Sequence, residues 1–351
     1  MFNKTLKKVT YLCSVTIGII CIVFFLFHAF AKDPAKMLIG QRTDIQTLEN
    51  IRKEMHLDKP ILQRFLYYLT DISPISVHLQ KEKTYLNYDY VLLVKITGYA
   101  LLLKKPYLGR SYQTNEKVWN VIVDHLYGTL LLSFFALCIA SSVGILAGVI
   151  AAVYKKTGLD YFIQLFTNIG ISLPSFFASL LMGWVFGYWL QDYTGLPFSG
   201  YILQFDPITL DFYYDWRYIV LPSLTLGLRP ASIITSLMRA NMIEILQEDY
   251  IRTARAKGLN NFKIIFKHAL RNGLNTVISA ISNWLASLIA GAFFVEYIFS
   301  WKGLGYLTVQ AIEQQDFPVI MGIVLVLGVF FVLLNFITDF LYQWADPRLR
   351  V

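Results

Sequence analysis

The sequence predicts an all-α polytopic membrane protein with six transmembrane helices and an extracytoplasmic α/β or irregular insertion. Of the 351 residues, 56% are hydrophobic and only 15% are charged, whereas a soluble domain is about 45–50% apolar and about one quarter charged. The mean hydropathy is +0.51, and the apolar residues gather in runs of about 20, the length of a helix that crosses a bilayer. This composition excludes a soluble enzyme and a nucleic-acid-binding module.

Six apolar runs are long enough to cross the membrane. They cover residues 9–31, 126–153, 162–190, 218–238, 274–298 and 319–344. The first run follows a basic N-terminus but is too long for a signal peptide and lacks a small-residue cleavage site, so we expect a retained anchor. The resulting domains are the cytoplasmic N-terminus with the first helix (1–31), an extracytoplasmic segment with the insertion (32–118), a five-helix transmembrane core (119–345) and a cytoplasmic tail (346–351).

Lysine and arginine residues in the short loops predict that both termini are cytoplasmic. Basic residues gather at the N-terminus, at 155–156, in the segment 239–271 and in the tail 348–350. The opposite short loops carry one basic residue each, Arg217 and Lys302. The net charge of +8 therefore indicates a basic cytoplasmic face and not nucleic-acid binding. The nearly apolar segment 85–103 would break this pattern as a seventh span, so we expect an external helix or hairpin there.

The sequence lacks the motifs of nucleotide hydrolysis and of nucleophilic or metal-dependent catalysis. It contains no G-x-x-x-x-G-K-[ST], no H-E-x-x-H, no S-x-x-K and no G-x-S-x-G. Charges within the expected spans are sparse, namely Arg229, Glu296 and Asp339. A proton-coupled carrier usually has a relay of such groups. We therefore expect no enzyme, and a secondary transporter is the less favoured alternative.

The cytoplasmic loop 239–273 carries the most specific signal. Glu248 and Asp249 begin a short predicted helix and Arg255 and Lys257 close it, an order that complements the helix dipole. Gly258 follows and can adopt the left-handed conformation that ends a helix. Small residues in this helix, Ala254 among them, would allow a partner to approach closely.

A second helix is predicted directly after this turn. Asn260 or Asn261 can cap it, and an amphipathic pattern follows in Phe262, Ile265, Phe266, Ala269 and Leu270. Such a helix can lie along a membrane surface. The pair of helices fits a rigid docking element for a partner protein. An ordinary basic loop also fits the composition, although it would not need two caps and a sharp turn.

This loop resembles the EAA loop of bacterial ABC importer permeases, in the form found in the dipeptide/oligopeptide family. The resemblance covers nearly the whole chain. Its motifs are the stretch 47–60, Leu108-Gly-Arg-Ser-Tyr112, Gly170-Ile-Ser-Leu-Pro-Ser-Phe176, Asp249–Leu259, His268–Asn272, Val295-Glu296, Trp301, Gly303-Leu-Gly305, Asp316-Phe-Pro318 and Asp346-Pro-Arg348. Arg252 and Thr253 depart from the general EAA pattern in the way typical of the peptide subfamily. The region 72–105 is longer than the family leads us to expect.

The resemblance implies the type I importer permease fold and the role of a B-type pore subunit in the bacterial cytoplasmic membrane. The implied partners are a second homologous permease, two ATP-binding subunits at the cytoplasmic face and an external substrate-binding protein. ATP and Mg would be bound by the ATPase subunits, and this chain would hold no cofactor, no metal and no catalytic residue. The cargo would be dipeptides or oligopeptides. Nickel, metallophore and glutathione importers share the same permease family and remain alternatives.

The resemblance also assigns residues. Those implied in ATPase coupling are Glu248, Asp249, Tyr250, Arg252, Thr253, Ala254, Arg255, Ala256, Lys257, Gly258 and Leu259. Candidates for the pore lining are Ser172, Ser175, Arg229, Ser232, Asn283, Ser287 and Glu296. Small polar residues equally often join helices within membranes. In the insertion, Tyr85, Tyr88 and Tyr90 are expected either to dock the binding protein or to cover the permease's own outer surface.

Overall fold

The computed structural model describes residues 2–30, 58–79, 88–96 and 99–345, with some side chains in these ranges left aside. Two compact units are present. The first comprises Met1–Asp124 with Thr308–Phe330, and the second comprises His125–Leu307 with Phe331–Val351. Three of the described helices have residues in both units: α5 (Val118–Val153), α14 (Leu304–Glu313) and α15 (Phe317–Ala345).

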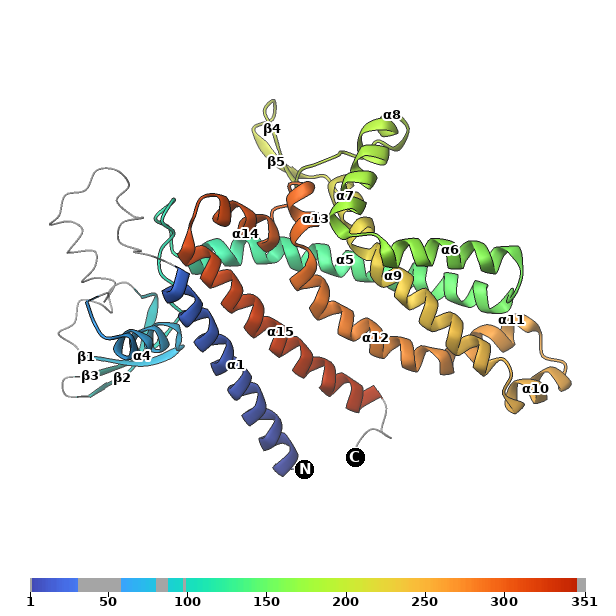
Figure 1. Ribbon diagram of the computed structural model, residues 1–351, viewed down its shortest axis with the longest axis horizontal. Helices are drawn as coiled ribbons and strands as arrows, with labels where there is room; N and C mark the ends of the chain where they lie inside the picture. The colour runs from blue at the N-terminus through green and yellow to red at the C-terminus, as the bar shows by residue number, and fades with distance from the viewer. Residues whose placement is uncertain (1, 31–57, 80–87, 97–98, 346–351) are drawn as a thin grey trace. The chain divides into compact units, whose positions relative to one another are not determined.

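The first unit contains the N-terminal helix and the insertion. Its elements are α1 (Phe2–Phe30), α4 (Ile61–Ile72), β1 (Ile75–Leu79), β2 (Tyr90–Ile96) and β3 (Tyr99–Lys104). The strands form an antiparallel sheet in the order β1-β3-β2, drawn in light blue in Figure 1. The register pairs Ile75 with Leu103 and Tyr90 with Lys104. Strands β2 and β3 therefore pair as an antiparallel hairpin would, whereas the external position of this segment and its role as an insertion stay predictions.

The insertion has a small core of its own on one face of this sheet. Leu102 is 1% exposed, and Tyr88 is also buried. The Tyr88 hydroxyl donates to the Asp71 carboxylate of α4, and the Lys104 ammonium lies 3.6 Å from the centroid of the Tyr88 ring. The expectation that Tyr88 offers a docking surface is therefore wrong, because its ring holds the insertion together. Tyr90 is partly exposed, and Tyr85 lies outside the described residues.

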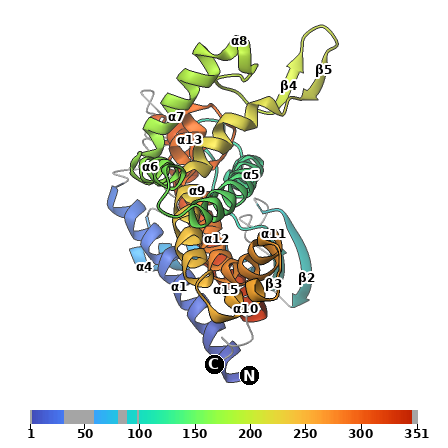
Figure 2. The same cartoon turned by 90° about the vertical axis from the view of Figure 1, so that its right-hand side faces the viewer.

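In its described residues, the second unit is helical apart from one hairpin and the loops between elements. Its elements are α6 (Gly158–Ser172), α7 (Ser175–Trp184), the π-helical turn η2 (Val185–Trp189), α8 (Gln191–Thr194), β4 (Leu203–Asp206), β5 (Asp211–Tyr214), α9 (Arg217–Ile245), α10 (Asp249–Ala256), α11 (Asn261–Lys263), the π-helical turn η3 (Ile264–Ala269), α12 (Leu270–Gly291) and α13 (Phe293–Ile298). Within this unit, α10 and α11 lie at one end, and α8 and the β4–β5 hairpin lie at the other (Figure 2).

Helix α9 forms the centre of the second unit. It runs beside α6 and α12 (Figure 1), and more of its surface is buried than that of any other described span. Close approach of α5 depends on a glycine, because a Cβ on Gly148 would lie 2.6 Å from the Cβ of Met238. Small residues allow membrane helices to pack backbone against backbone in this way.

Three described helices are long and apolar enough to cross a membrane: Val118–Val153, Arg217–Ile245 and Phe317–Thr338. Helix α6, together with α7 and η2, qualifies only as a pair of helices that is bent by 115°, so the apolar run 162–190 is either a broken span or a re-entrant loop. The break falls at Leu173 and Pro174. Proline disfavours helical backbone at the residue before it and cannot continue the hydrogen-bond ladder. The fifth expected span is likewise divided into α12 and α13.

Candidate coupling site

The loop between α9 and α12 adopts the predicted pair of helices. Helix α10 begins after Glu248 and ends before Gly258, whose φ is 74°. The backbone N–H groups of Gly258 and Leu259 donate to the carbonyls of Arg255 and Ala254, which satisfies the open end of the helix. The side chain of Asn260 accepts from the N–H of Phe262 at 3.2 Å and caps the next helix. Both local predictions, the glycine stop and the asparagine cap, are confirmed.

Helix α10 is mounted on the core of the second unit. Ile251 is fully buried and Ala254 is 7% exposed. Both belong to an apolar cluster with Met238 and Met242 of α9 and Ile264 of η3. The expectation that Ala254 faces a partner is therefore wrong, because its small side chain lets α10 sit closely on its own chain. Ala256, by contrast, is exposed.

The outer face of α10 is polar and carries charged side chains of both signs. Its exposed side chains are Asp249, Tyr250, Arg252, Thr253, Arg255, Ala256 and Lys257. Arg252 lies 3.3 Å from Asp249, but both side chains are exposed, and such a pair contributes little to stability. The amide of Asn272 donates to the Tyr250 hydroxyl at 2.8 Å. The segment 248–259, which we call the coupling segment, is therefore a short rigid helix that presents several cations outward.

The helix after the coupling segment departs from the predicted amphipathic pattern. Ile264 and Ala269 are buried, whereas the Phe262 and Phe266 side chains are 65% and 41% exposed. The π-helical hydrogen bonding of η3 explains the difference, because it adds a residue to the turn and brings positions five apart onto one face. The two phenylalanine rings lie 4.5 Å apart, so they form an exposed aromatic pair beside α10.

The candidates for the pore lining fall into different environments. Ser172 and Ser175 flank the α6–α7 break and are exposed, as are Arg229 and Ser287. Ser232 is buried against α6, where a Cβ on Gly170 would lie 2.2 Å from its Oγ. Ser232 therefore joins two helices and does not line a pore. The side chain of Asn283 lies outside the described residues.

Glu296 is also not a pore-lining residue, because it is 0% exposed. Its Oε2 accepts the backbone N–H of Gly305 at 2.6 Å and of Tyr306 at 3.3 Å, which places a carboxylate at the start of α14. A Cβ on Gly303 would lie 2.4 Å from the carboxyl carbon. Glu296 and the glycines thus form one folding motif in the loop before α14. The pattern Val295-Glu296…Gly303-Leu-Gly305 was visible in the sequence, but the contact between the glutamate and the glycines could not be predicted from it.

Two motifs that are distant in the sequence meet within the first unit. The Ser111 hydroxyl donates to Asp316 at 2.5 Å, and the N–H of Tyr112 donates to the same carboxylate at 3.1 Å. A further bond runs from the Gln113 amide to the carbonyl of Gln314 at 2.9 Å. The contact explains why a serine motif and an acidic motif occur together: the buried carboxylate needs hydrogen-bond donors.

Solved structures define the class of fold. The chain resembles a structure of the MetNI methionine ABC transporter in an inward-facing conformation, with a TM-score of 0.52 and 19% identity, over 65% of this chain and 97% of that chain. A second crystal form of the same transporter gives a TM-score of 0.51 at 20% identity, over 64% of this chain and 96% of that chain. The fold is thus that of a type I ABC importer permease, and it is mostly helical.

The family follows from the sequence. Residues 144–351 match the family described as the binding-protein-dependent transport system inner membrane component, and residues 1–80 match the N-terminal domain of such components. The chain belongs to this family, and the prediction of an ABC importer permease is confirmed.

Similar proteins include the dipeptide permease DppB of Alkalihalophilus pseudofirmus, which is 30% identical over 100% of both chains. The di/tripeptide permease DppB of Pseudomonas aeruginosa is 31% identical over 100% of this chain and 99% of its own. The glutathione permease GsiC of Escherichia coli is 31% identical, also over 100% and 99%.

Proposed function

We propose that this chain is one of two pore-forming permease subunits of an ATP-driven importer that passes dipeptides or oligopeptides from an external binding protein into the cytoplasm. The observation that carries the proposal is the coupling segment: a capped helix with a polar outer face that is mounted on the core through Ile251 and Ala254. A helix of this kind can transmit a push from a partner, because it cannot shift without the helices beneath it. The peptide cargo is supported by relatives named for dipeptide and di/tripeptide transport.

In the proposed mechanism, six spans cross the plasma membrane with both termini and the coupling segment on the cytoplasmic side. Two ATPase subunits bind ATP and Mg and dock on α10, and their closure displaces this helix. The displacement changes how the two permeases pack against each other. The permeases and the ATPases are thus coupled by movement alone, and no covalent reaction takes place on the permeases. Coupling then consists of two sites that bias one bistable helix bundle.

Substrate would pass between the two permeases beside the α6–α7 break. Ser172, Ser175, Arg229 and Ser287 are the exposed polar groups of this chain that we propose for the pore lining. Glutathione is a second candidate cargo, because a relative of 31% identity is named as a glutathione permease. It is itself a tripeptide-like molecule, so the same lining could serve either cargo.

Reconstitution tests the proposal directly. The chain is coexpressed with the proposed second permease, ATPases and binding protein, and the purified complex is placed in liposomes. We expect ATP-dependent uptake of a labelled dipeptide that needs the binding protein. A complex whose ATPase subunits cannot hydrolyse ATP is the control. If the importer takes up glutathione and no dipeptide, the cargo is the second candidate, glutathione. Uptake without ATP would contradict the proposal.

A further inference from the structure

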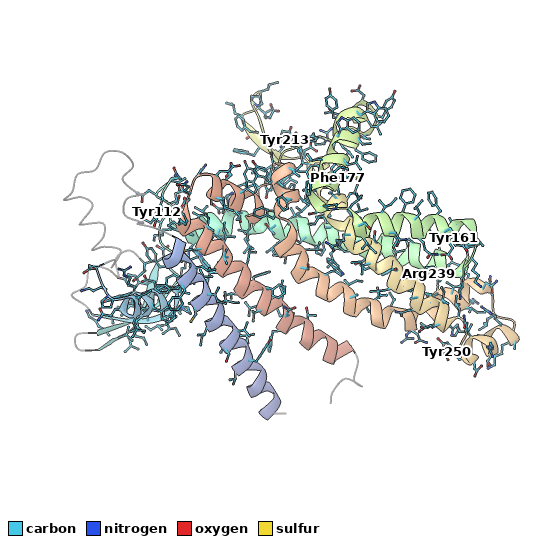
Figure 3. The ribbon with its side chains drawn as sticks, viewed as in Figure 1. Tyr112, Tyr161, Phe177, Tyr213, Arg239 and Tyr250 are labelled. Atoms are coloured by element: carbon cyan, nitrogen blue, oxygen red, sulfur yellow. The ribbon has the colours of Figure 1, made fainter. Side chains whose placement is uncertain are left out.

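We propose that the ion pair between Asp160 of α6 and Arg239 of α9 makes α6 move together with the coupling helix α10. The two residues would thus be positioning residues for transport. This inference rests on the function proposed above and adds the route by which movement of α10 reaches the pore. Arg239 and Tyr250 of α10 lie at the same end of the second unit (Figure 3).

The pair has a fixed geometry. Arg239 Nε donates to Asp160 Oδ1 at 2.7 Å, and its terminal nitrogen donates to Oδ2 at 2.8 Å. The Asp160 side chain is 1% exposed. The remaining capacity of the carboxylate is taken by the N–H of Lys156 at 2.9 Å and by the amide of Gln164 at 2.9 Å. Two parallel bonds set orientation as well as distance, so α6 can neither rotate nor slide against α9 without breaking the pair.

Helix α10 is linked to this ion pair through the apolar cluster at the same end of the second unit. Ile251 and Ala254 of α10 lie in one apolar cluster with Met238 and Met242 of α9. Arg239 directly follows Met238, so the guanidinium that holds α6 stems from a turn of α9 that lines the same apolar cluster as α10. Helix α10 itself packs on η3, whose Ile264 also belongs to this cluster. Packed interiors transmit displacement because they have few voids to absorb it. A displacement of α10 therefore reaches, through this packed cluster, the turn of α9 that holds α6.

Helix α6 carries the movement to the broken span. Near its far end, Gly170 lies so close to α9 that a Cβ would stand 2.2 Å from Ser232 Oγ. Helix α6 is thus held on α9 at both ends. It then breaks at Leu173 and Pro174, and α7 departs at 115°. Ser172 and Ser175, which we propose for the pore lining, stand on either side of that break, where a block formed by α6, α9 and α10 would move relative to α7.

The alternative is that the pair only stabilises the fold. A buried pair does not by itself indicate a gain in stability, because desolvation of both charges offsets their attraction. The two roles differ in one measurable quantity. A stabilising pair changes how much importer is present, whereas a positioning pair changes how much substrate is moved for each ATP hydrolysed.

The first experiment replaces Asp160 by Asn in the reconstituted importer. We expect ATP hydrolysis stimulated by the binding protein to stay within about twofold of the parent, while uptake per ATP falls about tenfold. Asp160→Glu keeps the charge and should recover part of the loss. The matched control is Asp215→Asn, because Arg217 also holds Asp215 through Nε and a terminal nitrogen but joins neighbours in sequence and not two helices. This control should keep the parent ratio.

A distance measurement tests the inference even if Asp160→Asn assembles poorly. Spin labels at Leu165 on α6 and at Gln247 next to α10 report whether the two move together in the parent importer, and a second pair uses Gln247 and Leu180 on α7. We expect the first distance to be equal in the resting and ATP-trapped states and the second to change. A change in the first distance, or an unaltered ratio in Asp160→Asn, would overturn the inference. A parent importer without ATP-driven uptake would instead contradict the proposed function.

Discussion

Gly258 is a residue whose backbone matters more than its surroundings. Its φ is 74°, and nothing lies within 4 Å of the position that a Cβ would take. A side chain at this position is therefore opposed by backbone strain alone and not by a steric clash. Ala254 is the opposite case, because a larger side chain there would enter the apolar cluster beneath α10. The two positions consequently test different properties of the coupling segment.

We predict that Gly258→Val abolishes uptake but leaves the protein in the membrane. A left-handed valine costs about 1–2 kcal/mol, which is too little to unfold the transmembrane core but enough to distort the end of α10. Gly258→Asn should retain most activity, because asparagine tolerates this conformation. The control is Gly195→Val, which has a φ of 63° and equally open surroundings at the other end of the unit. Normal uptake by Gly258→Val, measured with its ATPases bound, would contradict the assignment.

The insertion is an element whose stability should depend on pH through Lys104. Burial lowers the pKa of Lys104 from 10.5 to about 8, and the charge of Asp71 opposes this shift. Its ammonium is buried without a hydrogen-bond acceptor within the described residues and rests on the Tyr88 ring. Between the lower folded pKa and the ordinary pKa, the unfolded insertion binds more protons than the folded one. Stability therefore rises as the pH increases through this window.

We predict that Lys104→Met stabilises the insertion near neutral pH and removes its rise in stability toward about pH 10. The gain is at most about 3 kcal/mol, the free energy that corresponds to the pKa shift. Protection of β1 to β3 against amide hydrogen exchange, corrected for the intrinsic rate at each pH, measures it. Lys95→Met on the neighbouring strand is the control, because Lys95 is exposed. Equal protection of the parent at neutral and alkaline pH would argue against a desolvated ammonium.

At the scale of the whole molecule, the distribution of basic residues predicts a single orientation in the membrane. After replacement of Cys13, Cys21 and Cys138, single cysteines are placed at Ile208 in the β4–β5 hairpin and at Lys257 in the coupling segment. A membrane-impermeant maleimide should label Ile208→Cys in intact cells, since this position is 91% exposed. Lys257→Cys should react only after permeabilisation. Labelling of Lys257→Cys in intact cells would contradict both the predicted orientation and the proposed coupling role of the coupling segment.

Local chemistry could be predicted from the sequence with good accuracy. Gly258 and Asn260 act on backbone groups within a few residues, so the sequence alone places the helix stop and the helix cap. The break of the third span was also encoded, in Pro174, although the apolar composition on both sides favoured a continuous span. Tyr88, Ala254 and Glu296 could not be placed in this way. Their roles depend on partners from other elements, such as Lys104, Met242 and Gly303.

By itself, the sequence determined that the chain is a multispan membrane protein, where its apolar runs lie and what its coupling segment looks like. These properties follow from composition and from interactions within a few residues of one another. Only the tertiary structure decided which small and polar residues are buried, because hydrogen bonds such as Arg239 to Asp160 join residues far apart in the chain. A polar residue in an apolar run has the same local pattern whether it lines a pore or pairs with another helix. The long-range partner alone separates the two.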